Sequence, residues 1–210
     1  MSYAVKEMFL TLQGEGVQSG RRAVFVRFAG CNLWSGREAD RATAVCQFCD
    51  TDFVGVDGDG GGRFSDAKAL AGAVATLWGE GAWLRYVVLT GGEPMLQIDD
   101  ALIDALHARG FEIGVESNGT IAAHPGIDWL CISPKAGSDV VQKTGNELKL
   151  VWPQPGSDTN VMEDWAFDHH LVQPMDCADA AGARDAAIAF VMARPKWRLT
   201  TQAHKILGLR

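Results

Sequence analysis

Short runs of apolar and β-branched residues recur along the chain, and the runs end in polar or glycine residues. Such runs are typical of strands that are buried on both faces of a parallel sheet. Six of them are predicted to be strands, over residues 23–28, 85–89, 112–115, 128–132, 147–151 and 170–172. Segments with helical periodicity lie between several of the runs, so the pattern favours repeated β-α-β units.

Three main helices are predicted from the spacing of apolar residues. Their apolar faces carry Leu70, Val74, Leu77 and Trp78 in the first helix, Leu102, Ile103 and Leu106 in the second, and Ile188, Val191 and Met192 in the third, within residues 180–193. We expect Ser65 to cap the first helix, because a serine oxygen can accept a hydrogen bond from a free backbone N–H. Gly79, Gly110 and Pro195 mark the three ends.

The length limits the architecture that these elements can form. A complete barrel of eight β-α units needs about 250 residues, and this chain has 210. We therefore predict the α/β class and an abbreviated (partial) TIM-like barrel of about six parallel strands with three main helices. With 47% hydrophobic residues the chain can bury one core, so residues 1–210 are predicted to form a single domain, with an insertion at about 32–45.

The charge of the chain narrows the classes of partner. The formal net charge is −7 at pH 7, which argues against a nucleic-acid partner because phosphate binding needs a surplus of Lys and Arg. No apolar run approaches the roughly 18 residues of a membrane-spanning helix, and the first residues lack the layout of a signal peptide. We expect no membrane partner, a cytoplasmic location and a small-molecule site.

The cysteines carry the clearest candidate chemistry. Cys31 follows the first predicted strand, and 14 residues separate it from the pair Cys46 and Cys49. A structural zinc would need a fourth ligand from Cys131, Cys177 or a distant histidine, and a redox pair would leave Cys31 without a role. Three thiolates suit a 4Fe-4S cluster that keeps one iron open. Cys131 and Cys177 are expected to be small buried residues.

Five short motifs connect the cysteines to a known family. They are Leu12-Gln13-Gly14-Glu15-Gly16, Cys49-Asp50-Thr51, Thr90-Gly91-Gly92-Glu93-Pro94, Glu116-Ser117-Asn118-Gly119-Thr120 and His204-Lys205-Ile206-Leu207-Gly208. Together with the cysteines they resemble the radical S-adenosylmethionine superfamily, although the usual spacing there is Cys-x3-Cys-x2-Cys. The order of the motifs over nearly the whole chain resembles the 7-carboxy-7-deazaguanine synthase family.

The resemblance implies a lyase of queuosine (7-deazapurine) biosynthesis. Its reaction would convert 6-carboxy-5,6,7,8-tetrahydropterin into 7-carboxy-7-deazaguanine with loss of ammonia, through a 5′-deoxyadenosyl radical. The implied cofactors are a 4Fe-4S cluster, S-adenosyl-L-methionine and Mg2+. In such an enzyme the protein orients the reactants and excludes competing reactions.

The resemblance also implies roles for individual residues. The implied cluster ligands are Cys31, Cys46 and Cys49. S-adenosylmethionine contacts are implied for Phe48, Cys49, Asp50, Gly92, Glu116, Ser133, Pro134, Lys135, Gln173, Pro174, Met175 and Asp176. Substrate contacts are implied for Leu12, Gln13, Gly14, Glu15, Arg27, Thr90 and the terminal carboxylate of Arg210. Thr51 is the implied magnesium ligand, with Asp50 and Asp52 as alternatives.

The sequence itself also bears on the roles of Arg27 and Glu116. Arg27 alternates with apolar residues in a strand and must find an anion there, for which the pterin carboxylate is the candidate. Glu116 can accept hydrogen bonds from ribose hydroxyls, or it can pair with a neighbouring lysine or arginine instead.

Partners and rival functions complete the expectations. Beside the pterin, we expect an electron donor such as flavodoxin and a homodimer that uses the uncovered part of the barrel. Trp34, Arg37 and Arg41 in the insertion form either a docking surface or a cover for the cluster. The rival functions are a glycyl-radical activating enzyme and a non-catalytic zinc-binding module. Metal analysis distinguishes the zinc-binding module from the radical enzymes, because a cluster brings about four irons with sulfide.

Overall fold

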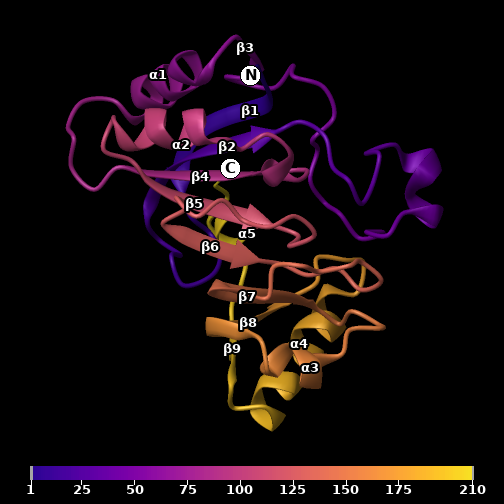
Figure 1. Cartoon of the computed structure of the whole chain (residues 1–210). Coiled ribbons are helices and arrows are strands. Elements are labelled where there is room, and N and C mark those ends of the chain that lie inside the picture. Colours follow the sequence, from indigo (N-terminus) through magenta and orange to yellow (C-terminus); the bar gives the residue numbers. More distant parts are fainter. Residues whose placement is uncertain (1, 210) are drawn as a thin grey trace.

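A computed structural model of the chain describes residues 2–209. Within this range the strands form one nine-stranded sheet in the order β3-β1-β2-β4-β5-β6-β7-β8-β9 (Figure 1). The two edge strands, β3 and β9, do not pair with each other, so the sheet stays open. The prediction of a partial barrel is confirmed.

The six predicted strands are all present, and they are neighbours in chain order. They are β2 (Arg22–Phe28), β4 (Tyr86–Gly91), β5 (Glu112–Ser117), β6 (Trp129–Ile132), β7 (Thr144–Trp152) and β8 (Ala166–Pro174). Each pairs in parallel with the next. A short seventh parallel strand, β9 (Trp197–Leu199), follows β8 at the edge.

Two further strands at the other edge were not predicted. β1 (Tyr3–Leu12) pairs with β2 in antiparallel fashion, and β3 (Gly62–Phe64) pairs with β1. Lys6 and Glu7 interrupt the apolar pattern of β1, and its register with β2 shifts between Val5 and Glu7. A register shift inserts an extra residue into one strand and breaks the alternation, which is why the sequence pattern missed this strand.

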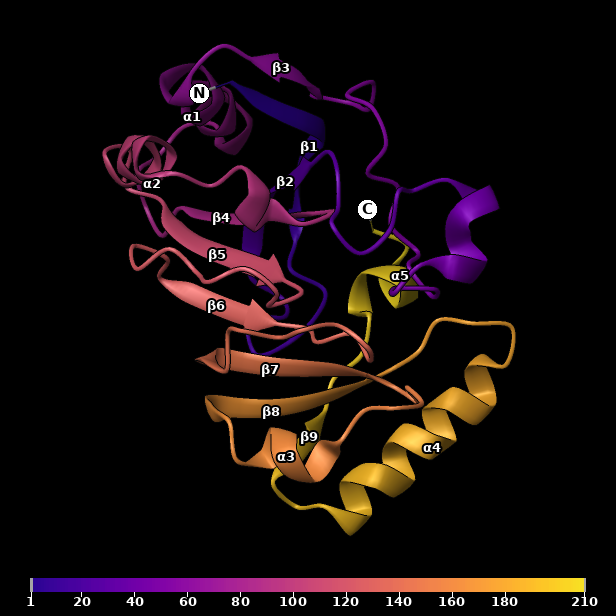
Figure 2. The same cartoon turned by 45° about the vertical axis from the view of Figure 1, so that its right-hand side comes forward.

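The three predicted main helices are α1 (Ala67–Trp78), α2 (Asp100–His107) and α4 (Ala180–Ala193). The described chain also contains the short helices α3 (Thr159–Glu163) and α5 (Ala203–Leu207), and the 3-10 turns η1 (Glu38–Thr43) and η2 (Pro94–Leu96). In Figure 2, α1 and α2 lie beside the first strands of the sheet, and α4 lies beside β7 and β8.

Two predictions about the helices were wrong. The N-cap of α1 is Asp66, whose carboxylate accepts from Ala69 N, rather than Ser65. On α4 the buried residues are Ala183 and Ala187, whereas Ile188 and Met192 are exposed and Val191 is only partly buried. Ala187 belongs to the core, and the partly buried Phe190 and Val191 pack against it.

The buried state predicted for the two other cysteines holds for only one of them. Cys131 is buried, in β6, whereas Cys177 is exposed. Cys177 lies between β8 and α4, and no packed element covers it.

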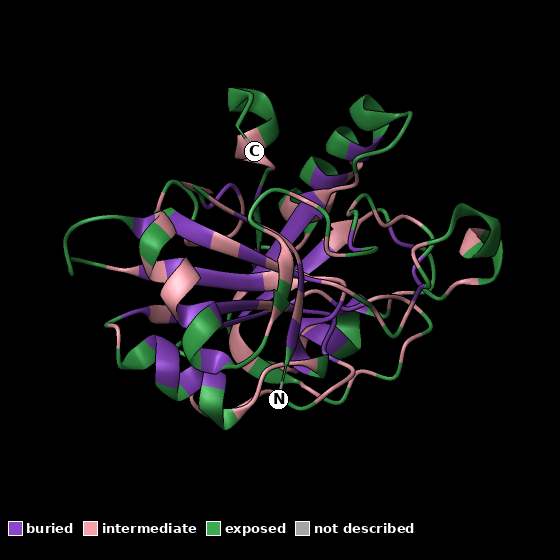
Figure 3. Cartoon of the chain, turned by 90° about the horizontal axis from the view of Figure 1, so that it is seen from above, coloured by how far each residue is buried: buried purple, intermediate pink, exposed green. Residues whose placement is uncertain are grey.

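Alternation along the parallel strands separates the hydrophobic core from a polar face. Side chains such as Val26, Leu89 and Ile113 pack into the core together with α1 and α2. The neighbouring positions carry polar side chains that line a cavity: Arg27, Thr90, Glu116, Lys149 and Gln173, one each from five strands. Figure 3 shows buried strands at the centre and exposed residues on the outer sides of the helices. No helix among the described residues is long and apolar enough to cross a membrane.

Candidate functional site

The cavity has a volume of about 600 Å³. Its walls come from the ends of the parallel strands, the loop between β1 and β2, the cysteine loop between β2 and β3, and helix α5. Clefts of this size are typical of small-molecule sites. Segments from both ends of the described chain therefore meet over the polar face of the sheet.

The three cysteines of the metal prediction line this one cavity. The Cys46 thiol donates a hydrogen bond to Cys49, which lowers the pKa of Cys49 to about 6 and raises the pKa of Cys46. Burial raises the pKa of Cys31, although Leu33 N donates to its sulfur at 3.4 Å. A low thiol pKa favours the thiolate that binds metal.

The donor set fits a cluster better than a single ion. Among residues 2–209, no three His, Cys, Asp or Glu side chains stand close enough together to share one metal ion. In a 4Fe-4S cluster each thiolate binds a different iron, so the sulfurs stand farther apart than around one zinc. Backbone N–H groups directed at the sulfurs, as at Cys31, also tune such clusters.

The insertion packs against the cysteine loop. Trp34 is 8% exposed and lies edge-on to Phe53, with ring centroids 5.6 Å apart. The Arg41 guanidinium stacks over Trp34 at 4.1 Å and donates to the carbonyl oxygens of Gln47 and Cys49 at 3.0 and 3.1 Å. This part of the insertion therefore holds the loop that carries Cys46 and Cys49.

The turn after β4 approaches the first cysteine closely. A Cβ atom on Gly92 would stand 2.0 Å from the carbonyl oxygen of Gly30 and 3.0 Å from Cys31 Cβ. Only glycine permits such an approach. The contact lets Glu93 N donate to Gly30 O at 2.9 Å, which fixes the backbone just before Cys31.

Glu93 joins two of the motifs. Its carboxylate is fully buried and accepts from Met95 N, Ser117 Oγ and Asn118 N at 3.0, 2.8 and 2.8 Å. Burial raises the pKa of Glu93, and these hydrogen bonds oppose the rise. The turn after β4 and the tail of β5 are thereby held in register beside the cavity.

Charged side chains at the other end of the cavity are already paired. Arg27 Nε donates to Glu7 Oε1 at 2.8 Å, and both side chains are about one-fifth exposed, at 21% and 17%. Lys149 Nζ lies 2.6 Å from a carboxylate oxygen of each of Glu15 and Glu116. Glu116 thus has the lysine partner that the sequence left open.

The C-terminal segment closes over the loop between β1 and β2. Ala203 N donates to Gly14 O at 2.8 Å, and a Cβ on Gly14 would stand 2.2 Å from His204 Nδ1. Lys205 donates to Asp50 Oδ2 at 2.8 Å and also to Asp176. In Figure 2, α5 accordingly lies between the strand ends and the segment that carries η1. Arg210 lies outside the described residues.

Nearly all the predicted site residues that the structure describes come together. Those that line the cavity are Leu12, Gln13, Gly14, Glu15, Arg27, Cys31, Cys46, Phe48, Cys49, Asp50, Thr51, Thr90, Gly92, Glu116, Ser133, Lys135, Gln173, Pro174, Met175 and Asp176. Pro134 faces a smaller cavity on the side of α3 instead. Their contacts with ligands stay predictions.

Sequence reasoning missed several residues of the cavity, above all Lys149, with Gln202, His204 and Lys205 given no role of their own. A signal for Lys149 was available. It alternates with Leu148 and Leu150 in a buried strand, as Arg27 does between apolar residues, and a buried charge needs a partner. The partners themselves, at sequence separations of 134 and 33 residues, could not be found from the pattern.

Comparisons with known proteins agree with this geometry. The 7-carboxy-7-deazaguanine synthase of Bradyrhizobium diazoefficiens is 61% identical to the chain over 210 residues, covering 100% of both. That of Bordetella pertussis is 56% identical over 209 residues, again covering 100% of both. The crystal structure of QueE from Escherichia coli matches with a TM-score of 0.72 at 26% identity, covering 97% of this chain and 95% of that one. No family model matches the chain.

Proposed function

The chain belongs to the 7-carboxy-7-deazaguanine synthase family, and from this premise we propose how its residues bind the reactants. It is a radical S-adenosylmethionine enzyme of queuosine biosynthesis. The observation that carries the assignment of residues is the meeting of three cysteines and the polar strand ends in one cavity. Its reaction converts 6-carboxy-5,6,7,8-tetrahydropterin into 7-carboxy-7-deazaguanine and ammonia.

Cys31, Cys46 and Cys49 would hold the 4Fe-4S cluster. A cluster held there would supply the electron for reductive cleavage of bound S-adenosylmethionine to a 5′-deoxyadenosyl radical. Arg41 supports the ligand loop through its two bonds to the carbonyls of Gln47 and Cys49. Cys46 would have to give up the proton that it donates to Cys49 before it could bind iron, because only thiolates are ligands.

S-adenosylmethionine would lie along the strand ends. Phe48 offers a ring for the adenine beside Lys135, whose Nζ stands 5.9 Å from the ring centroid. Gly92 lets the backbone approach the cofactor's amino group beside the cluster, and Glu116 offers oxygens to the ribose. The remaining proposed contacts are Cys49, Asp50, Ser133, Lys135, Gln173, Pro174, Met175 and Asp176, all of which line the cavity. Pro134, between Ser133 and Lys135 in the chain, is a further proposed contact, although its side chain lines the smaller cavity.

The pterin would lie between Arg27 and the loop between β1 and β2. Arg27 offers a guanidinium to the substrate carboxylate, and its present partner Glu7 holds it at the cavity wall. Gln13, Gly14 and Glu15 offer donors and acceptors to the aminopyrimidine edge, with Leu12 and Thr90 beside them. Arg210 is proposed to join them.

A magnesium ion is proposed at Thr51. Mg2+ prefers oxygen ligands and keeps several waters, so one hydroxyl with substrate oxygens suffices. Thr51 lines the cavity between Asp50 and Asp52. Asp52 is 70% exposed and pairs with Lys6 at 2.9 Å, which makes it the weaker alternative.

The proposed partners are the pterin and an electron donor such as flavodoxin, in the cytoplasm. Trp34 is buried and Arg41 is bound to the cysteine loop, so the insertion supports the role of a cover more than that of a docking surface. Arg37, which is exposed, is its remaining candidate contact for a donor. We also propose a homodimer.

An anaerobic assay tests the proposed function. The reconstituted protein is mixed with S-adenosylmethionine, a reductant, Mg2+ and 6-carboxy-5,6,7,8-tetrahydropterin, and the products are followed by mass spectrometry. We expect 7-carboxy-7-deazaguanine without stoichiometric loss of S-adenosylmethionine. Cleavage of S-adenosylmethionine with an unchanged pterin would refute the substrate. Zinc without sulfide in the purified protein would refute the cluster.

A further inference from the structure

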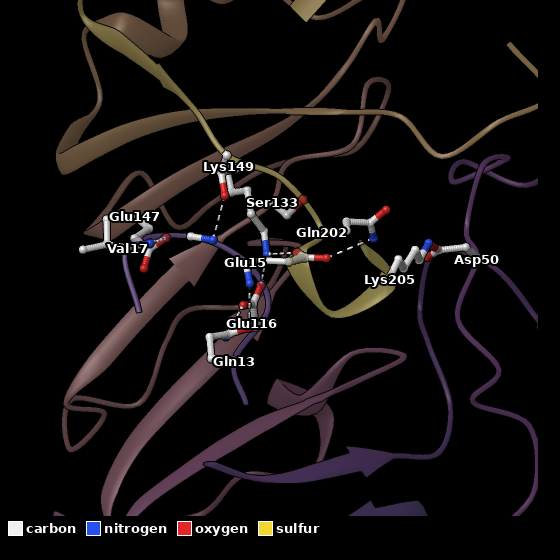
Figure 4. Close-up of polar contacts among 12 residues, drawn as sticks. Gln13, Glu15, Val17, Asp50, Glu116, Ser133, Glu147, Lys149, Gln202 and Lys205 are labelled. Atoms are coloured by element: carbon white, nitrogen blue, oxygen red, sulfur yellow. Dashed lines mark hydrogen bonds and ion pairs between the residues drawn. The ribbon is translucent and has the colours of Figure 1, made fainter. Parts of the chain in front are cut away.

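A buried lysine joins the two halves of the cavity. Lys149 is 4% exposed, and its ammonium lies 2.6 Å from Glu15 Oε2 and 2.6 Å from Glu116 Oε2 (Figure 4). Glu15 comes from the loop between β1 and β2, Glu116 from β5 and Lys149 from β7. Three segments that are far apart in the sequence therefore meet at one nitrogen atom.

Each carboxylate accepts a further hydrogen bond from a glutamine side chain. Gln202 Nε2 donates to Glu15 Oε1 at 3.0 Å, and Gln13 Nε2 donates to Glu116 Oε1 at 3.2 Å. Gln13 belongs to the proposed pterin side, yet it contacts the carboxylate proposed for the ribose. A shift of Glu15 or Glu116 is thus passed on through Lys149, and Gln13 provides a second link.

The ion pair favours the charged forms of Lys149 and Glu15. Burial alone would lower the pKa of Lys149, but Glu116 and Glu15 raise it above its usual value. Burial likewise opposes ionisation of Glu15, and Lys149 outweighs this and lowers the pKa of Glu15. Without the ammonium, the carboxylates of Glu15 and Glu116, which are only 17% and 20% exposed, would face each other unpaired, and their repulsion would turn the side chains apart.

We propose that Lys149 is a positioning residue that holds Glu15 toward the pterin and Glu116 toward the ribose, and so couples the binding of substrate and cofactor. This inference rests on the proposed function, because it assigns the two carboxylates to the two ligands. Lys149 itself acts through the carboxylates. Binding of one ligand orders a shared network, and the second ligand then binds to a network that is already ordered.

The test compares Lys149→Met, Lys149→Arg and the control Lys143→Met. Methionine keeps the length of the side chain and removes its charge. Arginine keeps the charge, but its broad guanidinium cannot occupy the place of an ammonium without moving the carboxylates. Lys143 is an exposed lysine just before β7, and it does not line the main cavity.

Binding is measured by calorimetry on reconstituted, unreduced protein, so that no turnover occurs. S-adenosylmethionine is titrated with and without 6-carboxy-5,6,7,8-tetrahydropterin, and the ratio of the two Kd values gives the coupling. We expect a ratio of about 10 for the wild type and for Lys143→Met, within the usual range for coupled sites. For Lys149→Met we expect weaker binding of both ligands and a ratio near 1.

A double variant guards against loss of folding. Lys149→Met with Glu116→Gln removes one carboxylate together with the cation, so that no repelling pair remains. We expect it to melt closer to the wild type than Lys149→Met does, yet to retain a coupling ratio near 1. Lys149→Arg should fold and bind the pterin at least fivefold more weakly.

The outcomes separate the two proposals. If the wild type does not bind or convert the pterin, the proposed function fails and this inference fails with it. If the wild type converts the pterin and a folded Lys149 variant keeps both affinities and the coupling ratio, only this inference fails. Full recovery of binding in Lys149→Arg would reduce Lys149 to a structural ion-pair partner and would also overturn it.

Discussion

Replacing Gly92 by alanine places a methyl group 2.0 Å from the carbonyl oxygen of Gly30 and 2.5 Å from its carbonyl carbon. Real Cβ atoms essentially never approach closer than 3.0 Å, so the backbone next to Cys31 must move by about 1 Å. Because both contacts are with backbone rather than with a flexible side chain, no change of rotamer can relieve the clash. The hydrogen bond from Glu93 N to Gly30 O lies in the path of that movement.

The magnitude follows from two costs. Overpacking of a tight site costs about 1–3 kcal/mol, and loss of one hydrogen bond costs about 0.5–1.5 kcal/mol. A total of about 1.5–4.5 kcal/mol corresponds to a Tm lower by roughly 3–18 °C for a chain of this size. The same displacement moves Cys31, so we also expect less iron to be retained after reconstitution.

Gly72→Ala is the matched control. Gly72 lies within α1, and the nearest atom that its Cβ would meet is Arg109 Nη2 at 3.8 Å. Alanine in an open helical position stabilises by about 0.5–1 kcal/mol, which raises Tm by roughly 1–4 °C. Thermal melts of the metal-free proteins and iron analysis after reconstitution are the assays. A Gly92→Ala protein with the Tm and iron content of the wild type would refute the argument.

Three further predictions concern the contacts around the cavity. Arg41→Lys loses the stack on Trp34 and the paired hydrogen bonds to the cysteine loop. For a loss of about 1–2 kcal/mol, a chelator should remove iron about 5–30 times faster than from the wild type, whereas Arg37→Lys, at an exposed position, should match the wild type. Equal rates of iron loss for the wild type and both variants would contradict the role of Arg41. Burial in the folded state raises the pKa of Glu93 above 4.5. Above pH 4.5 the folded protein therefore binds more protons than the unfolded protein. The wild type should lose stability relative to Glu93→Gln as the pH rises from 4.5 through the raised pKa. Melts from pH 4 to pH 8 check this, and a difference in Tm that does not change with pH would count against it. Lys205→Met removes the ion pairs between α5 and the carboxylates of Asp50 and Asp176. Because these side chains are 40–49% exposed, we expect the free energy of unfolding to fall by no more than about 1 kcal/mol, but hydrogen exchange over residues 200–209 to become faster. Unchanged exchange would show that other contacts hold α5.

The sequence was sufficient to predict the parallel half of the sheet. Strands such as β4 and β5 contain short runs of buried residues that end in polar residues, and these runs carry their signal locally. The antiparallel edge carries no such signal. In β1, Lys6 and Glu7 find partners in loops and in β2, and contacts of that range leave no trace in the alternation of apolar and polar residues.

The candidate site divides in the same way. Cysteine spacing and the glycine turn are local patterns, and they were sufficient to place Cys31, Cys49 and Gly92 at one rim. The network around Lys149 depends on which strand end faces which loop, and that follows only from the order of the strands. Arg27 was expected to need an anion, and Glu7, a neighbour in the sheet, already supplies one.

The closure of the cavity by residues 13–16 and 200–205 bears on how the protein is made. Gly16 N donates to Thr200 Oγ1, and Gln202 Nε2 donates to Glu15, across 184 and 187 residues of sequence. Contacts of such separation form late, because the chain between them must be ordered first. During translation the sheet can therefore assemble strand by strand while the binding site still lacks one wall, and competence to bind arises only in the last step of folding.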